Sequence, residues 1–398
     1  MLLGEEALTA EDEARIGGKA AGLLRLRRAG ARVPPWFVVA TEAFASHLAQ
    51  GALAQELEQE LGALAKLDAA QKLPELEQRT AELRKRIEAA PLDADFRARL
   101  DATLSVLGPG PYAVRSSMVG EDGQNRSFAG QLDTFLFQDA AEVPRAVVRC
   151  WASAFTARAV AYRARSAEGH GLPRMGVVVQ RMINGRASGV MFTVNPLTGR
   201  TDQALISACW GVGEGVVSGH CNTDEFVWDH AGRESAVTIA DKDTQIVHRQ
   251  DGAPGTVEAE VASELRQKRC LTVDEVATLA NEGLRLAKTL GAPLDIEWTF
   301  AEDGLHLLQA RPITATAPPV APPSVGSEPD LSGPIVIWDN SNIQESYCGV
   351  TTPLTFSYAR IGYASAYEQL MRIGRLPEHV IVEQRPVLQN LLGLINGR

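Results

Sequence analysis

Hydrophobic and polar residues alternate strictly in the stretch Asp295-Ile296-Glu297-Trp298. In an extended strand the two acidic side chains share one face and the two apolar side chains share the other. A Glu302-Asp303-Gly304 turn follows, where glycine can take a positive φ, and a largely apolar segment from 305 to 309 returns. The pattern predicts a hairpin with four polar side chains gathered at one end, namely Asp295, Glu297, Gln309 and Arg311.

Helical spacing of apolar residues dominates two other regions. Residues from about 52 to 106 are rich in Ala, Leu, Glu, Gln, Lys and Arg, and predict a helical scaffold with a solvated charged face. A second pattern opens with the capping box Thr272-Val273-Asp274-Glu275, runs to about Leu290 and ends at Gly291.

Short apolar runs predict strands before and between these helices. A proline-bounded strand is expected at 33–40 and another at 111–117. Segments 175–182 and 187–193 are expected to pair as a hairpin through Asn184-Gly185. A further pair is expected from 204–208 and 224–227.

Composition narrows the functional classes. The chain has 398 residues, 45% of them hydrophobic and 22% charged, which fits two or three globular domains. A net charge of -10 without a basic block argues against a nucleic-acid partner, and no apolar run is long enough for a membrane span. The acidic start does not resemble a signal peptide. Five dispersed cysteines fit reduced thiols, so we expect a cytoplasmic protein (Cys150, Cys209, Cys221, Cys270 and Cys348).

Three places carry candidate chemistry. Lys19 follows a double glycine in the first turn of an Ala/Leu-rich helix, either as an anion-binding lysine or as a solvated one. Arg115 ends an apolar strand before a polar loop, either as a phosphate clamp or as a surface cation. The hairpin end is either a Mg²⁺-polyphosphate site or a surface ion pair. A glycine-rich stretch at 210–219 lacks the last glycine of GxGxxG, so a Rossmann site is rejected and a loop that lets backbone approach a ligand is expected.

Four motifs occur in order over residues 10 to 314: GGKAAGLL, VRSS…SFAGQLDTFL, VVVQRMINGRASGVMFT…GVGEGVVSG…DEF and DIEW…LLQARP. Together they resemble the N-terminal ATP-binding region of the phosphoenolpyruvate synthase and pyruvate phosphate dikinase family, an architecture that rifamycin phosphotransferases share. The resemblance implies an ATP-grasp fold of the α+β class, with two lobes that hold ATP between them. We expect a first lobe over 1–195 with the helical insertion at about 52–106, and a second lobe over 196–314. A proline-rich linker over 315–334 and a truncated, partly helical connector over 335–398 would follow.

The resemblance also implies site residues. Lys19, Arg115 and Arg311 match the catalytic cations around the phosphates, and Glu297 and Gln309 match the pair that positions Mg²⁺. Gln180 and Met182 resemble the strand that lies along adenine. Gly130 and Thr134 belong to the lid-like edge over the phosphates, and Glu214 belongs to the glycine-rich loop. Asp295 is expected to support the site rather than to bind the metal directly.

The implied function is that of a phosphotransferase module with ATP and Mg²⁺ as cofactors, which phosphorylates a histidine and ultimately pyruvate. None of the seven histidines has the family's histidine-motif context, and the chain is too short to add a pyruvate-binding barrel. The phosphohistidine domain is therefore expected on a separate chain or in a missing C-terminal part. Open alternatives are a module of a rifamycin-type small-molecule phosphotransferase, a non-catalytic nucleotide-binding subunit and an ATP-grasp carboxylate ligase.

Overall fold

The computed structural model describes five long stretches of the chain, 1–50, 53–64, 73–120, 132–164 and 171–313, and three short helical pieces, 367–369, 371–372 and 377–382. The chain divides into two compact units, Met1–Val320 and Ala321–Arg398. Gly130, the expected linker and most of the expected connector lie outside the described residues. The architecture given below is that of the first unit.

The first sheet has five antiparallel strands in the order β1-β2-β5-β3-β4. Their bounds are β1 (Leu2–Gly4), β2 (Trp36–Val39), β3 (Tyr112–Met118), β4 (Thr134–Gln138) and β5 (Met175–Arg181). Successive residues of β2 enter two different cores, because Trp36 and Val38 pack with one cluster while Phe37 and Val39 pack with another. Burial on both faces explains why β2 and β5 read as continuous apolar runs rather than as alternating ones.

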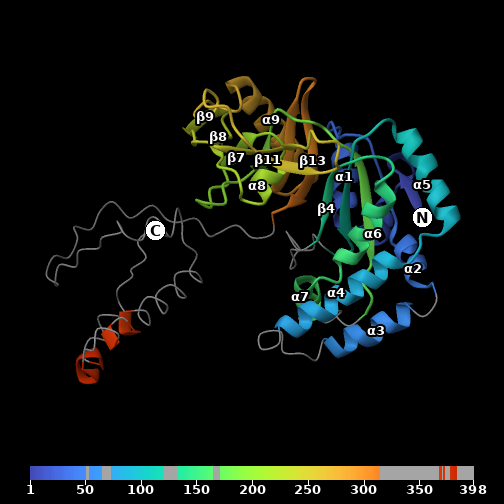
Figure 1. The fold of residues 1–398 in the computed structure, drawn as a ribbon. Coiled ribbons are helices and arrows are strands. Elements are labelled where there is room, and N and C mark those ends of the chain that lie inside the picture. Colours follow the sequence, from blue (N-terminus) through green and yellow to red (C-terminus); the bar gives the residue numbers. More distant parts are fainter. Residues whose placement is uncertain are drawn as a thin grey trace. The chain divides into compact units, whose positions relative to one another are not determined.

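Six helices cover one face of this sheet (Figure 1). They are α2 (Thr41–Leu48), α3 (Leu53–Leu64), α4 (Leu73–Ala89), α5 (Ala94–Leu107), α6 (Val143–Ser153) and α7 (Ala157–Ala164). Trp151 of α6 stacks on Phe44 of α2 with ring centroids 5.4 Å apart. The helical scaffold predicted at 52–106 is confirmed for its described residues. Within the described part of the chain, no helix is both long and apolar enough to cross a membrane.

Helix α1 (Glu13–Arg28) covers the other face. It follows two short 3₁₀ turns, η1 (Glu5–Ala7) and η2 (Ala10–Asp12). Gly17 interrupts it with φ 77°, so the regular helix starts at the double glycine, as expected. A side chain at Gly17 would collide with the Ser117 carbonyl of β3, and one at Gly22 would collide with the Ala310 carbonyl. Glycine at these two positions therefore lets α1 lie directly against strands that come much later in the chain.

The second sheet has six strands in the order β13-β12-β6-β7-β8-β9. Their bounds are β6 (Ala187–Phe192), β7 (Gln203–Trp210), β8 (Asp224–Asp229), β9 (Arg233–Thr238), β12 (Leu294–Ala301) and β13 (Gly304–Pro312). The predicted pair 204–208 with 224–227 and the predicted terminal hairpin are both confirmed. Helix α9 (Val273–Leu290) also starts and ends as predicted, with a Thr272–Glu275 capping box and a left-handed Gly291.

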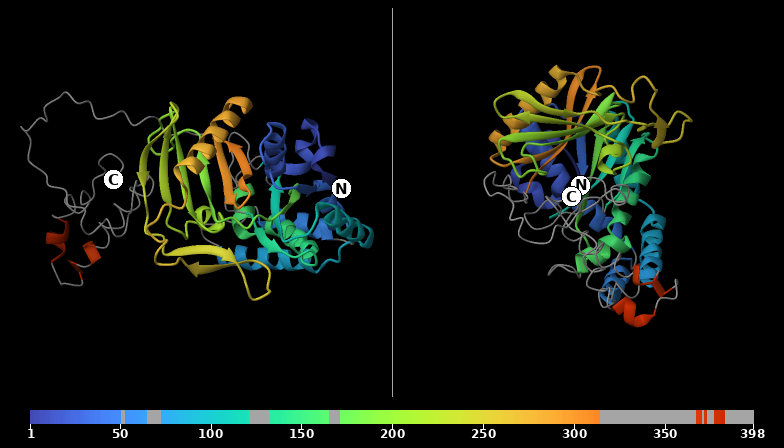
Figure 2. Two further views of the ribbon diagram at one scale, coloured as in Figure 1. Left: turned by 90° about the horizontal axis from the view of Figure 1, so that it is seen from above. Right: turned by 90° about the vertical axis from the view of Figure 1, so that its left-hand side faces the viewer.

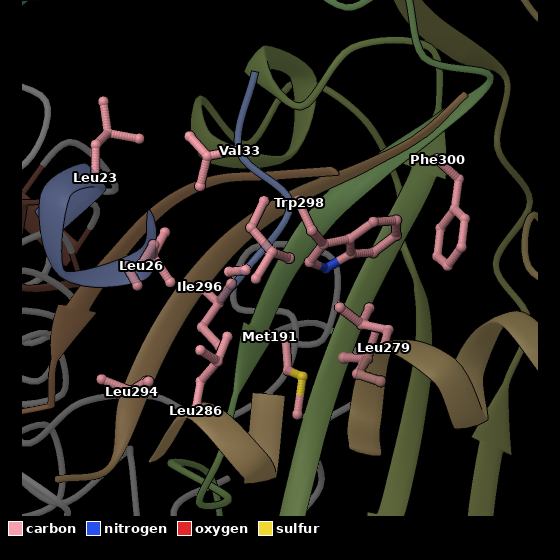
Figure 3. Packing of buried hydrophobic residues seen from close by; sticks show 14 of the residues in the cluster. Leu23, Leu26, Val33, Met191, Leu279, Leu286, Leu294, Ile296, Trp298 and Phe300 are labelled. Atoms are coloured by element: carbon pink, nitrogen blue, oxygen red, sulfur yellow. The ribbon is translucent and has the colours of Figure 1, made fainter. Parts of the chain in front are cut away.

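A single core joins α1 to the second sheet. Leu23 and Leu26 of α1 belong to the same apolar cluster as Ile296 and Trp298 of β12 (Figure 3). Leu279 and Leu286 of α9, together with Met191 of β6, complete the cluster in the same view, so helix and sheet close around one interior. Because α1 also packs on β3 and β5, it fixes the first sheet against β13.

A two-stranded ribbon, β10 (Thr244–His248) with β11 (Thr256–Glu260), extends from the second sheet and appears in yellow in Figure 2. His248 stacks on Phe137 of β4, with centroids 4.2 Å apart. Phe137 is the non-glycine residue with a positive φ, 50°, in the described chain. The ribbon therefore contacts both sheets. Beside it lies α8 (Glu214–Val217), a single helical turn.

The predicted pairing of 175–182 with 187–193 is wrong. β5 pairs with β2 and β3, whereas β6 pairs with β12 and β7 in the other sheet. Gly185 does not form a hairpin turn. It lets the backbone lie close to β12, because a side chain at this position would collide with the Thr299 hydroxyl. The chain thus changes sheets between Arg181 and Ala187, whereas the lobe boundary was expected at 195.

Candidate functional site

Arg115 lies where the two sheets meet. It sits in the middle of β3, its side chain is 10% exposed, and its guanidinium reaches across to the β12–β13 hairpin. Nη2 donates to Glu297 Oε2 at 2.8 Å and to Gln309 Oε1 at 2.7 Å. Nη1 donates to the Leu308 carbonyl at 2.9 Å. Arg115, predicted from one stretch of the sequence, is therefore in direct contact with Glu297 and Gln309, predicted together from another.

The hairpin register explains how two acceptors converge on one nitrogen. Glu297 pairs with Gln309, but the next pair is Trp298 with Leu307, so Leu308 is the extra residue of a β-bulge. The bulge leaves the Leu308 carbonyl outside the ladder and available to Arg115. Ile296 and Trp298 are fully buried while Glu297 is partly exposed, as the alternating pattern requires. The sequence signalled the hairpin but not the bulge.

Lys19 is placed by Ser117, a residue that the sequence analysis did not select. The Ser117 hydroxyl accepts from Ala20 N at 3.1 Å and donates to the Ile16 carbonyl at 2.8 Å. These bonds tie the first helical turn after Gly17, which carries Lys19, to the strand that carries Arg115. The signal was present in the sequence, since Ser117 follows Arg115 by two residues and so shares its strand face.

The charge of Lys19 acts on the thiol of Cys150, a residue of α6. Burial raises the pKa of the Cys150 thiol, and the Lys19 ammonium opposes that rise. The Cys150 sulfur in turn contacts the Val114 carbonyl at 3.6 Å, one residue before Arg115. Thr134 pairs with Arg115 across β3 and β4 and is exposed, so it too borders this region. Thr134 and the helical turn that carries Lys19 are thus both attached to β3, the strand of Arg115.

Arg311 is held by Asp295 at the end of the hairpin. The two residues pair across the strands, and Arg311 Nε and Nη2 each lie 2.8 Å from Asp295 Oδ2. Burial raises the pKa of Asp295, while the Arg311 charge works in the opposite direction. Arg311 remains one-third exposed. It thus lies next to the Arg115 cluster, with its orientation set by a carboxylate.

The two residues predicted to lie along adenine, Gln180 and Met182, have different surroundings. Gln180 is buried in β5, and its amide donates to the Pro34 carbonyl at 3.5 Å. In this structure it therefore connects β5 to the segment that precedes β2. Met182, by contrast, packs against a small apolar cluster formed by Phe137, Cys209, Val212, Cys221 and Ile246, with Leu136 and Val216.

Glu214 is exposed at the start of α8 and accepts from the Thr256 hydroxyl at 2.6 Å. It therefore ties the glycine-rich loop to the β10–β11 ribbon. The glycines of this loop face their own chain: a side chain at Gly211 would collide with the Ile246 carbonyl, and one at Gly215 with the Cys221 sulfur. The loop is expected to let backbone approach a ligand, yet in this structure the close approaches are to Ile246 and Cys221.

Glu297 and Gln309 also fit a hard cation. Their two oxygens already converge on one positively charged nitrogen, and carboxylate and amide oxygens are ligands that Mg²⁺ accepts. No cluster of three His, Cys, Asp or Glu side chains able to hold a metal occurs among the described residues. A metal at this pair would therefore draw its remaining ligands from water or from phosphate oxygens.

The sequence matches the family model described as "Pyruvate phosphate dikinase, AMP/ATP-binding domain" over residues 13–324. The chain belongs to this family. With the two α/β lobes around Arg115, the assignment confirms the α+β, ATP-grasp fold and the resemblance to the phosphoenolpyruvate synthase family.

Several named proteins align with the same region. A rifampicin phosphotransferase from Streptomyces sp is 40% identical over 77% of this chain and 35% of its own length. A probable phosphoenolpyruvate synthase from Methanocaldococcus jannaschii is 35% identical over 78% of this chain and 26% of its own length. The prodigiosin synthesizing transferase PigC of Serratia marcescens is 35% identical over 87% of this chain and 37% of its own length. The chain thus spans less than two fifths of each of these relatives.

A D-alanine-D-alanine ligase from Helicobacter pylori superposes with a TM-score of 0.31 at 11% identity, covering 78% of this chain and 57% of that one. The family assignment rests on the sequence match rather than on this superposition.

Proposed function

We propose that this chain binds ATP with Mg²⁺ between its two sheets and transfers a phosphoryl group to a histidine on a separate domain or chain. The observation that carries the proposal is the convergence of Glu297, Gln309 and Arg115 on one point. Phosphoryl transfer needs in-line positioning and cancellation of charge on the non-bridging oxygens, and a buried arginine beside two hard oxygens supplies both.

Each residue has a role in this proposal. Glu297 and Gln309 would hold Mg²⁺, which supplies charge neutralisation to the phosphates when it is bound. Arg115 would then turn from these oxygens to the transferred phosphoryl group. Lys19, in the first turn of its helix, and Arg311, oriented by Asp295, would bind the remaining phosphate oxygens.

The purine would lie on the side of the glycine-rich loop, away from the hairpin that carries Glu297 and Gln309. The apolar cluster around Val212 and Ile246 includes Met182, which favours a flat apolar ring there. We propose that Gln180, Thr134 and Gly130 line this path, and Glu214 would contact the nucleotide after releasing Thr256.

The names of the relatives refer to three different compounds, phosphoenolpyruvate, rifampicin and prodigiosin. We propose pyruvate as the final acceptor, and a rifamycin-type small molecule as the second candidate, supported by the 40% identity to the Streptomyces protein. We propose that the acceptor binds outside the matched region, which is about a third or less of these relatives. We place this chemistry in the cytoplasm.

The test follows label from ATP to a histidine. The chain is incubated with β- or γ-labelled ATP, Mg²⁺ and a separately expressed histidine domain, and label on the histidine is measured with time. Transfer that requires both the chain and Mg²⁺ is expected. ATP that binds without any transfer would instead favour a nucleotide-binding subunit, and label on a substrate carboxylate would favour a ligase.

Metal binding is tested separately by calorimetry. Glu297→Gln is expected to remove most of the Mg²⁺ enhancement of ATP binding, because an amide holds the metal less strongly than a carboxylate. Glu302→Gln, on the exposed turn of the same hairpin, is the matched control and should bind like the unaltered chain. Equal ATP affinity with and without Mg²⁺ in the unaltered chain would remove the metal from the proposal.

A further inference from the structure

Two cysteines bracket the glycine-rich loop. Cys209 lies near the end of β7, and Cys221 follows the loop just before β8. The eleven residues between them, 210–220, contain the α8 turn and four glycines. Both thiols are free and buried, and both belong to the small apolar cluster that also includes Ile246.

The two thiols lie in the same small apolar cluster as Phe137, Val212 and Ile246, and each shifts the pKa of the other. The Cys221 sulfur also lies so close to Gly215 that a β-carbon there would be 2.4 Å from it, which packs the sulfur between α8 and β7. Cys221 N donates to the Gly215 carbonyl at 3.1 Å, which fixes the cysteine backbone in the same place.

The environment makes the two thiols chemically unequal. The hydrogen bond with Cys209 lowers the pKa of Cys221, and further hydrogen bonds to Thr244 and Ile246 of β10 act in the same direction. The same contact and burial raise the pKa of Cys209. Since the thiolate is the reactive form, Cys221 is the nucleophile of the pair.

Access to Cys221 requires only a local opening. Residues 217–220, immediately before it, are all exposed. α8 has only four residues, and such a short helix has little stability of its own. Gly211 and Gly219, with φ of 78° and 71°, give the loop backbone conformations that other residues rarely adopt.

We propose that Cys209 and Cys221 form a redox-sensitive pair that a low-molecular-weight disulfide converts to a protein disulfide, and that this bond fixes the glycine-rich loop and weakens nucleotide binding. The second half of the proposal rests on the proposed function.

The chemistry is two successive thiol–disulfide exchanges. The Cys221 thiolate attacks one sulfur of the small disulfide, and the S–S bond breaks to release one small thiolate, which takes up a proton. Cys209 then loses its proton and attacks the Cys221 sulfur of the mixed disulfide, which releases the second small thiol. Two protein thiols are oxidised, and one small disulfide is reduced to two thiols.

Three contacts connect the pair to the nucleotide side. Glu214 of the bracketed loop bonds to Thr256 of the ribbon, and Val216 packs in the same cluster as Met182. Cys221 itself packs in that cluster with Ile246 of β10. A disulfide would draw Cys221 from β10 towards β7 and hold α8 there, so the loop could not adapt around a ligand.

The first experiment identifies the bond. The folded chain is treated with oxidised glutathione, free thiols are alkylated, and peptides are analysed by mass spectrometry. A Cys209–Cys221 cross-linked peptide is expected, which should disappear in Cys221→Ser and persist in Cys270→Ser and Cys150→Ser. A Cys209–Cys270 bond, or retention of four alkylated thiols at these positions, would overturn the proposal.

The second experiment measures ATP affinity by calorimetry before and after oxidation. Affinity is expected to fall about tenfold on oxidation, to recover on addition of a reducing thiol, and not to change in Cys221→Ser. Equal affinity in both redox states would overturn the regulatory half. Absence of ATP binding in the reduced chain would instead overturn the proposed function, and the cross-linked peptide would still decide whether the pair exists.

Discussion

The two sides of the candidate site are built differently. On the side of β3, β12 and β13, Arg115 and Gln309 are buried and their polar atoms are bonded to each other across two sheets. On the side of the glycine-rich loop, Glu214 is exposed, α8 is a single turn, and the supporting apolar cluster has only five buried members among the described residues. The difference indicates that the phosphate side is preorganised by the core, while the loop side can adapt to what it binds.

The largest effect should come from Arg115, at the centre of the rigid side. Arg115→Ala is expected to lower phosphoryl transfer by at least about a thousandfold while weakening ATP binding only modestly, because the cation acts mainly on charge in the transition state. Single-turnover transfer and calorimetry separate the two effects. Arg97→Ala, which removes an exposed arginine of α5, is the control. Unchanged turnover in Arg115→Ala would exclude Arg115 from the mechanism.

Truncation of Trp298, which is fully buried behind the hairpin, compares the stability of the two sides directly. Trp298→Ala is expected to lower the free energy of unfolding by about 3–5 kcal/mol, because it leaves a cavity in the shared core. Val217→Ala, in α8 and 60% exposed, should change it by less than about 0.5 kcal/mol. Chemical denaturation measures both. Similar losses in the two variants would remove the contrast between the sides.

Ser117 and Ser116 offer a matched pair within β3. Both are fully buried, but Ser117 bonds to Ile16 and Ala20 whereas the Ser116 hydroxyl has no hydrogen-bond partner among the described residues. Ser117→Ala should cost about 1–3 kcal/mol of unfolding free energy by leaving buried backbone groups unpaired, and Ser116→Ala should be neutral or stabilising. If the two variants are equally stable, Ser117 does not anchor the helix that carries Lys19.

The smallest effect is expected at Glu214, on the adaptable side. Glu214→Gln keeps an acceptor for Thr256, so the free energy of unfolding should change by less than about 0.5 kcal/mol. ATP affinity should change only several-fold, by less than a substitution at Glu297. Thr256→Val, which removes the donor, is the companion variant, and calorimetry measures both. An effect of Glu214→Gln as large as that of Glu297→Gln would show that the loop side is as critical as the hairpin side.

Local patterns predicted the elements that local chemistry determines. The hairpin followed from alternation and Gly304, and α9 followed from its capping box and Gly291. Strand partners were less accessible, because pairing depends on segments far apart in the chain. The Asn184-Gly185 dipeptide reads as a hairpin turn, yet the strands on either side of it join different sheets.

The candidate site shows the same limit. Motif resemblance indicated Arg115, Glu297 and Gln309, and the structure places them in contact, although their roles remain a prediction. The Leu308 carbonyl was not predictable, since a bulge depends on the register between two strands. The shared cluster of Cys209 and Cys221 likewise depends on how the loop folds back on β10.

The position of α1 has a consequence for dividing the molecule. By sequence it belongs with the first sheet, but Leu23 and Leu26 complete the interior beneath the second sheet, and Gly22 lies against Ala310 of β13. A cut between Arg181 and Ala187 would therefore give two fragments that each lack part of a core. Neither fragment should fold alone, but the two should recover structure when mixed, as in a split-protein complementation pair.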